Sequence, residues 1–156
     1  EPVFGSVNVS ELINRCLLLS RHKLELQHIE SHVSVQEGMP SIHGDFNQLQ
    51  QCIINLIFNA VDAMPDGGHI WISANAEKAG DCLTIELRDS GPGISEADLP
   101  RIFEPFYSTK AAGYGVGLGL STVYGIVAYH GGSISAANAN GQGARFSISL
   151  PVVKNF

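Results

Sequence analysis

The sequence predicts a two-layer α/β sandwich, in which a mixed, mostly antiparallel sheet carries helices on one face. Stretches that alternate apolar and polar residues, as half-buried strands do, are interleaved with three stretches of helical periodicity. Two pairs of strands are joined by short turns that contain Gly, which indicates antiparallel hairpins. Strands and helices in this order pack as a sheet covered by a helical layer.

The first part of the chain is expected to contain short strands around one helix. Val7–Val9 is predicted as a short strand, and Ser10 as the N-cap of a helix that ends near Leu26. Ile29–Val35 alternates as a strand does, and Ser41–Gly44 is a short stub before the next helix.

The helix Gln48–Met64, capped by Asp45, is the most informative element. Its apolar face is broad, and the opposite face carries Gln48, Gln51, Asn55, Asn59 and Asp62. A surface helix normally carries Lys and Glu there, because both form helices well and are readily solvated. Short, oxygen-bearing side chains suit a metal ion or a small ligand better, with an ordinary solvated face as the open alternative.

The second half is expected to form two hairpins separated by a long loop and a helix. The turn Pro65–Gly68 ends the preceding helix. The expected strands are His69–Ala76, Cys82–Asp89, Ser133–Asn138 and Ala144–Leu150, and the helix runs from about Leu118 to His130. The loop Ser90–Gly119 is too long to lack a role. We therefore expect a lid over residues 95–119.

Length and composition bound the function. The 156 residues, 44% of them apolar, fit one globular domain over residues 1–156, and the sequence starts without Met, as an excised piece of a larger protein would. The net charge of −6 argues against nucleic-acid binding, and no apolar stretch predicts membrane contact. Cys16, Cys52 and Cys82 fit no metal spacing and are expected to be reduced core residues of a cytoplasmic protein.

Two glycine-containing motifs carry the chemistry. In Asp89-Ser-Gly-Pro-Gly-Ile94, a carboxylate at a strand end precedes glycines that would let a flat ligand approach the backbone; a plain turn is the alternative. In Gly113–Leu120, glycines on alternate residues run into a helix, which favours phosphate binding at its N-terminus over a flexible linker. Neither a Walker loop nor a dinucleotide fingerprint matches that run. Lys110 is the basic group placed where phosphate would arrive.

Together these motifs resemble the ATP-binding domain shared by gyrase, heat-shock chaperones, sensor histidine kinases and mismatch-repair ATPases, known as the Bergerat fold. The similarity to histidine kinases is closest, and covers almost the full chain. Asn55–Ala60 looks like their N box, Asp89–Gly93 their G1 box, Phe103–Phe106 their F box and Gly115–Leu120 their G2 box. Phe103–Lys110 and His130-Gly-Gly resemble the nitrogen-regulation and oxygen-sensing branch in particular.

The resemblance implies roles for individual residues. Asn59 would ligate Mg²⁺ together with the ATP phosphates, with Asn55 beside it, and Asp89 would bind the adenine amino group. Catalysis would rest on Asn55, Asn59 and Lys110. The residues expected around the nucleotide are Asn59, Asp62, Asp89, Gly91, Gly93, Ile94, Phe103, Phe106, Lys110, Gly115, Val116, Gly117, Leu118, Gly119 and Leu120.

Asn55 separates the subfamilies. In the gyrase and chaperone ATPases a Glu at this position activates water, whereas an amide has no useful basicity. The γ-phosphoryl group would therefore go to a histidine, with positioning and Mg²⁺ supplying most of the catalysis. The alternatives are a gyrase-type clamp, a serine kinase of the anti-sigma type, and a nucleotide-binding module without activity.

The acceptor is expected outside this sequence. His22, His28 and His32 are expected at the surface, and none of the six histidines lies in the family's acceptor motif. The partners implied are a dimerisation domain that carries the acceptor histidine and, indirectly, a response regulator. Ala144 stands where the family usually has Thr or Ser. Its loss of one hydroxyl contact near Asp89 costs about 1 kcal/mol unless water replaces it, and binding is expected to survive.

Overall fold

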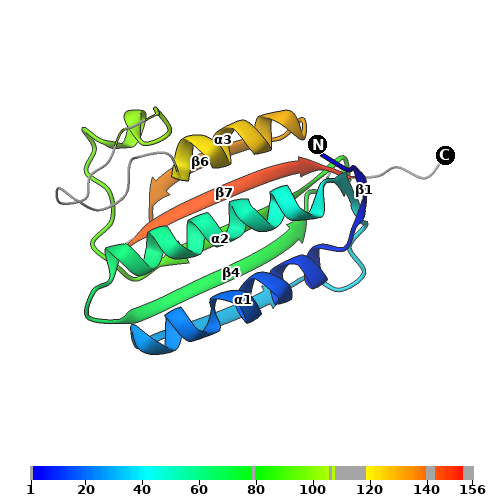
Figure 1. The fold of residues 1–156 in the computed structure, drawn as a ribbon. Coiled ribbons are helices and arrows are strands. Elements are labelled where there is room, and N and C mark those ends of the chain that lie inside the picture. Colours follow the sequence, from blue (N-terminus) through cyan, green and yellow to red (C-terminus); the bar gives the residue numbers. More distant parts are fainter. Residues whose placement is uncertain (1, 79, 106, 108–118, 140–142, 153–156) are drawn as a thin grey trace.

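The computed structural model describes residues 2–78, 80–105, 107, 119–139 and 143–152, and within them three α-helices cover one face of a five-stranded sheet (Figure 1). The helices are α1 (Val9–Leu26), α2 (Phe46–Ala63) and α3 (Gly119–Tyr129). The sheet has the order β2-β4-β5-β7-β6 and is formed by Ile29–Val35, Gly68–Ala76, Cys82–Asp89, Ala144–Pro151 and Ser133–Asn138. A small second sheet pairs β1 (Gly5–Val7) with β3 (Ile42–Gly44), and a 3₁₀ turn, η1, spans Leu99–Arg101.

The sheet is mixed, as predicted. β2 runs parallel to β4, whereas the pairs β4–β5, β5–β7 and β6–β7 are antiparallel. Apolar side chains alternate along each central strand and meet the apolar face of α2, whose buried residues include Leu56 and Ile57. The core therefore lies between the sheet and the three helices, and the two-layer prediction is confirmed.

The start of the chain differs from the prediction. The strand expected at Val7–Val9 is instead Gly5–Val7, and α1 already begins at Val9. Asn8 is the N-cap rather than Ser10, because its side-chain oxygen accepts the backbone N–H of Glu11 at 2.9 Å. Asn caps a helix about as well as Ser does, so residue type alone did not separate the two candidates.

The corner between β3 and α2 is held by Asp45 and His130. The Asp45 side chain caps α2 by accepting the N–H of Gln48 at 2.9 Å, and it also accepts the N–H of Val3 at 2.6 Å. His130 accepts the backbone N–H of Asp45 through Nε2 at 3.0 Å and donates from Nδ1 to the carbonyl of Ile126 at 2.8 Å. These partners require the neutral tautomer with the proton on Nδ1. The corner thereby joins α2 to the end of α3.

The expectation that all three cysteines are core residues needs refinement. Cys16 and Cys52 are buried free thiols, but Cys82 is only half-buried because it lies on the face of β5 that points away from the helices. Burial raises the pKa of both buried thiols to about 12, so neither is a reactive nucleophile. Among the described residues, no helix has both the length and the apolar character needed to cross a membrane.

The cap at Asp45 predicts a pH-dependent contribution to stability. Hydrogen bonds from the N–H groups of Gln48 and then Val3 lower the pKa of Asp45 below its usual value. Asp45→Asn keeps a capping oxygen but loses the charge and one acceptor. Because the pKa is lower in the folded state, we expect the wild type to be more stable than this variant at neutral pH. Its advantage should fade as the pH falls below about 4.

Chemical unfolding of both proteins at neutral and acidic pH measures this difference. Asp66→Asn, in the exposed turn after α2, is the matched control and should show no such change. A stability difference between wild type and Asp45→Asn that stays constant with pH would contradict the assignment.

Candidate functional site

Asp89 is a carboxylate in an apolar row. It is the last residue of β5 and follows Leu83, Ile85 and Leu87 on the face of the strand that points toward the helices. Its side chain is 2% exposed. Burial of an ionised group is costly unless hydrogen bonds compensate, so a carboxylate in this row calls for a specific partner.

Two backbone amides orient this carboxylate. Oδ1 of Asp89 accepts the N–H of Gly91 at 2.9 Å and the N–H of Ala144 at 3.2 Å. Within the described part of the chain, no hydrogen bond reaches Oδ2. Burial raises the pKa of Asp89, against the opposing effect of the two amides. The carboxylate is thus fixed through Oδ1, and its Oδ2 has no hydrogen-bond donor among the described residues.

Glycines allow the backbone to surround Asp89 closely. A Cβ on Gly91 would lie 3.2 Å from the carbonyl oxygen of Ala63 at the end of α2. A Cβ on Gly143 would overlap the carbonyl oxygen of Asp89, and the φ of +88° at this glycine is unfavourable for other residues. Gly143 was not predicted as a site residue. Its position directly before the last strand was the one feature of the sequence that could have indicated a close backbone approach there.

Asn138, at the end of β6, fixes the segment that follows Gly93. Its Oδ1 accepts the N–H of Ile94 at 2.8 Å, and its Nδ2 donates to the carbonyl of the same residue at 2.7 Å. Gly93 has φ +84° and approaches Asn138 so closely that an added Cβ would lie 2.7 Å from Oδ1. Sequence analysis missed Asn138, because a single Asn at a strand end is ordinary and carries no signal of this contact.

The polar stripe of α2 connects the segment 89–94 to the start of α3. Nδ2 of Asn55 lies 3.4 Å from the carbonyl oxygen of Gly119, the first residue of α3. Asn59 follows one helical turn later and is half-buried, and the carbonyl of Ala63, at the end of the helix, lies near Gly91. Asn59 therefore lies between two predicted motifs. Its amide oxygen is a suitable ligand for a hard cation such as Mg²⁺.

Some of the other predicted residues lie within the described part of the structure, and the rest lie outside it. Phe103 is half-buried, with its ring centroid 5.8 Å from that of Tyr124 and 6.4 Å from that of Phe146, so it packs against α3 and β7. Ile94 and Leu120 pack against the core, whereas Asp62 is exposed. The predicted residues Phe106, Lys110, Gly115, Val116, Gly117 and Leu118 lie outside the described residues.

Comparison with known proteins agrees with this arrangement. Residues 44–154 match the family of histidine kinase-, DNA gyrase B- and HSP90-like ATPases. The chain is 39% identical over 147 residues to sensor histidine kinase ZraS of Escherichia coli O157:H7, a match covering 94% of this chain and 31% of that protein.

Solved structures give the same result. Full-length ShkA in complex with AMPPNP superposes with a TM-score of 0.87 at 29% identity, covering 99% of this chain and 32% of that one. The catalytic domain of histidine kinase ThkA superposes with a TM-score of 0.86 at 29% identity, covering 97% of this chain and 99% of that domain.

The match to ThkA therefore runs over a whole catalytic domain, whereas the chain spans about a third or less of the curated kinases that it resembles. The N box on α2, the buried Asp89 and the glycines beside it lie within the matched region. This chain belongs to the family of histidine kinase-, DNA gyrase B- and HSP90-like ATPases.

Proposed function

We propose that this chain is the catalytic domain of a sensor histidine kinase, which binds Mg-ATP and transfers the γ-phosphoryl group to a histidine on a separate dimerisation domain. The observation that carries the proposal is the buried carboxylate of Asp89. Its Oδ1 is engaged by two amides, and no described residue donates to its Oδ2. A ligand that brings an N–H donor to Oδ2 offsets the cost of burying the charge.

Adenine fits this requirement. Its exocyclic amino group is a donor, and its flat ring can lie against backbone that carries no side chain at Gly91 and Gly93. The hydrogen bonds between Asn138 and Ile94 hold the next part of that segment in place. The base is therefore recognised by a rigid surface rather than by one that must order on binding, which lowers the entropic cost of association.

Asn59 is the proposed Mg²⁺ ligand. It is half-buried on α2, between Asn55, which contacts the start of α3, and Ala63, which lies near Gly91. The N-terminus of α3 is a favourable place for phosphate, because its first N–H groups have no partner within the helix. Gly115–Gly119 and Lys110 complete the phosphate site in this proposal.

The proposed phosphoryl transfer follows from the absence of a basic side chain at position 55. An amide at Asn55 cannot take a proton from water, so hydrolysis of bound ATP is slow. Transfer needs the imidazole nitrogen of the acceptor to attack the γ-phosphorus, as the bond to the β–γ bridging oxygen breaks and ADP leaves. The domain contributes position and electrostatic stabilisation, and Mg²⁺ offsets the phosphate charge when it is bound.

The partners follow from this role. The acceptor histidine lies on the dimerisation domain of the parent protein, and the phosphoryl group passes from it to an aspartate of a response regulator. We infer from the resemblance of Phe103–Lys110 and His130-Gly-Gly that the parent belongs to the nitrogen-regulation and oxygen-sensing branch. We place the domain in the bacterial cytoplasm because ATP and the response regulator are available there.

Asn59→Ala tests the metal site. We expect the affinity for ATP in the presence of Mg²⁺ to fall at least tenfold, about 1.4 kcal/mol, because the protein loses its oxygen ligand to the ion. The free energy of unfolding should change by no more than about 0.5 kcal/mol. Gln51→Ala, exposed on the same helix, is the control and should bind normally. Calorimetric titration with ATP measures the affinity of both variants. An unchanged affinity in Asn59→Ala would exclude Asn59 as the Mg²⁺ ligand.

Incubation with labelled ATP tests the reaction. When the domain is mixed with the helical dimerisation domain of its own parent, we expect a label on the latter that acid removes, as it removes phosphate from histidine. The domain alone should hydrolyse ATP very slowly. An acid-stable label would indicate a serine kinase, and rapid hydrolysis by the isolated domain would indicate an ATPase of the clamp type.

A further inference from the structure

A group of ring and carboxylate side chains occupies the open face of the sheet, on β2 and β4. Glu30 pairs with His69 across these two parallel strands, and His32 pairs with Trp71. Ile70, next to His69, is buried against the helices. Because side chains alternate between the two faces of a strand, these four side chains lie on the face away from the helices and from Asp89.

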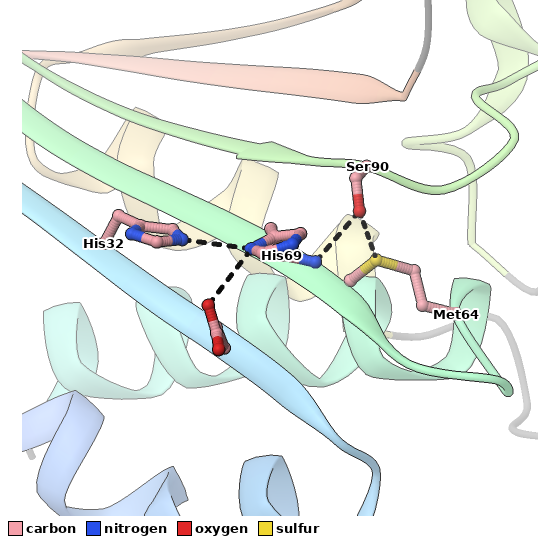
Figure 2. Close-up of polar contacts among 5 residues, drawn as sticks. His32, Met64, His69 and Ser90 are labelled. Carbon is pink, nitrogen blue, oxygen red and sulfur yellow. Dashed lines mark hydrogen bonds and ion pairs between the residues drawn. The ribbon is translucent and has the colours of Figure 1, made fainter.

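Three donor atoms of this group converge. Nε2 of His32 lies 3.1 Å from Nδ1 of His69, and the same Nδ1 lies 3.6 Å from a carboxylate oxygen of Glu30. All three donor atoms lie within 4.8 Å of one another. Figure 2 shows the rings of His32 and His69 directed toward each other. A tetrahedral ion with ligand bonds of about 2.1 Å holds its donors roughly 3.4 Å apart, so the spacing suits a small metal ion.

We propose that Glu30, His32 and His69 bind a divalent transition-metal ion, with Zn²⁺ as the expected ion. Two imidazole nitrogens and one carboxylate oxygen form a ligand set that Zn²⁺, Ni²⁺ and Cu²⁺ prefer, whereas Mg²⁺ and Ca²⁺ prefer oxygen alone. Three protein ligands leave at least one coordination position for water. The charge of Glu30 offsets part of the charge of the ion.

The imidazole rings are held in place before an ion arrives. The ring of Trp71 stacks against both, with centroids 5.5 Å from His32 and 5.6 Å from His69. Arg88, on the next strand, lies with its guanidinium carbon 4.0 Å from the centroid of the Trp71 ring. The indole therefore supports the two ligand rings and in turn contacts Arg88. Ligands fixed by packing lose little freedom on binding, which favours the metal complex.

The backbone of His69 is also fixed. Its N–H donates to Oγ of Ser90 at 2.9 Å and its carbonyl accepts the N–H of Ser90 at 3.1 Å, while the Ser90 hydroxyl lies 3.4 Å from Sδ of Met64 (Figure 2). Ser90 directly follows Asp89, yet the ligand side chains point to the opposite face of the sheet. The metal site is therefore separate from the proposed nucleotide site.

Titration of the nucleotide-free chain, without a polyhistidine tag, tests the proposal. Zn²⁺ binding is measured by calorimetry, and Ni²⁺ binding by the fluorescence of Trp71, which is the only tryptophan of the sequence. We expect one Zn²⁺ per chain. We also expect Ni²⁺ to quench the fluorescence, because the indole lies against both ligand rings, and Zn²⁺ to reverse this quenching by displacement.

Variants assign the ligands. His32→Gln and Glu30→Gln, both at exposed positions, should each weaken Zn²⁺ binding at least several-fold, and the double variant His32→Gln/His69→Gln should abolish it. His22→Gln, an exposed histidine on α1, is the matched control and should bind as the wild type does. Zn²⁺ binding that is equal in the wild type and the double variant would overturn the proposal, as would quenching that Zn²⁺ does not reverse.

Because no nucleotide is present, this outcome does not depend on whether the chain binds ATP. If the two sites are separate, the double variant should lose Zn²⁺ binding but bind ATP as the wild type does.

Discussion

The hydrogen bonds from two backbone amides to the buried carboxylate of Asp89 are the constraint on which the site depends. The amide of Gly91 comes from the segment after β5, and the amide of Ala144 comes from the start of β7. Meeting both requires that the chain turn tightly at Gly91 and that Gly143 lie against the Asp89 carbonyl. The pairing of β5 with β7 brings these segments together. The hydrogen bonds to Asp89 therefore depend on the register between β5 and β7.

The contact of residue 144 with Asp89 does not depend on the side chain at that position. The resemblance predicts Thr or Ser at position 144. Ala144 lacks that hydroxyl, but its contact with Asp89 is made by the backbone N–H. That contact is the same for any residue other than Pro. The energetic cost of Ala is thus limited to what the missing hydroxyl would have added. Helix α2 borders the proposed nucleotide site on its other side, with Asn55 near the start of α3 and Ala63 near Gly91.

Much of this structure could be predicted from local patterns, and the remainder depends on distant contacts. β2, β5 and β6 begin and end at the predicted residues, because polar and apolar residues alternate over most of each strand, most regularly in β5. The buried carboxylate was also visible, since an Asp follows three core residues in β5. The start of α1 was misplaced because Asn8 and Ser10 are equally suited to cap it.

The roles of Asn138 and His32 could not be predicted, since they depend on partners far away in the sequence. Asn138 bonds Ile94, which is 44 residues away, and His32 meets His69, which is 37 residues away. Such contacts follow from strand order and register, which a single sequence does not specify. Lys110 and Gly115–Leu118, predicted from the glycine-rich motif and from the resemblance, lie outside the described residues and stay predictions.

The affinity of Asp89→Asn for ATP, measured together with its free energy of unfolding, tests the central claim most directly. Asn keeps an oxygen for the two amides but presents N–H groups where the adenine amino group must donate. We expect ATP affinity to fall by about 1.5–3 kcal/mol, roughly 10- to 150-fold, because a hydrogen bond to a charged group is lost. Stability should be equal or higher, because burial disfavours the wild-type charge. Unchanged ATP affinity in a folded Asp89→Asn protein would contradict the account.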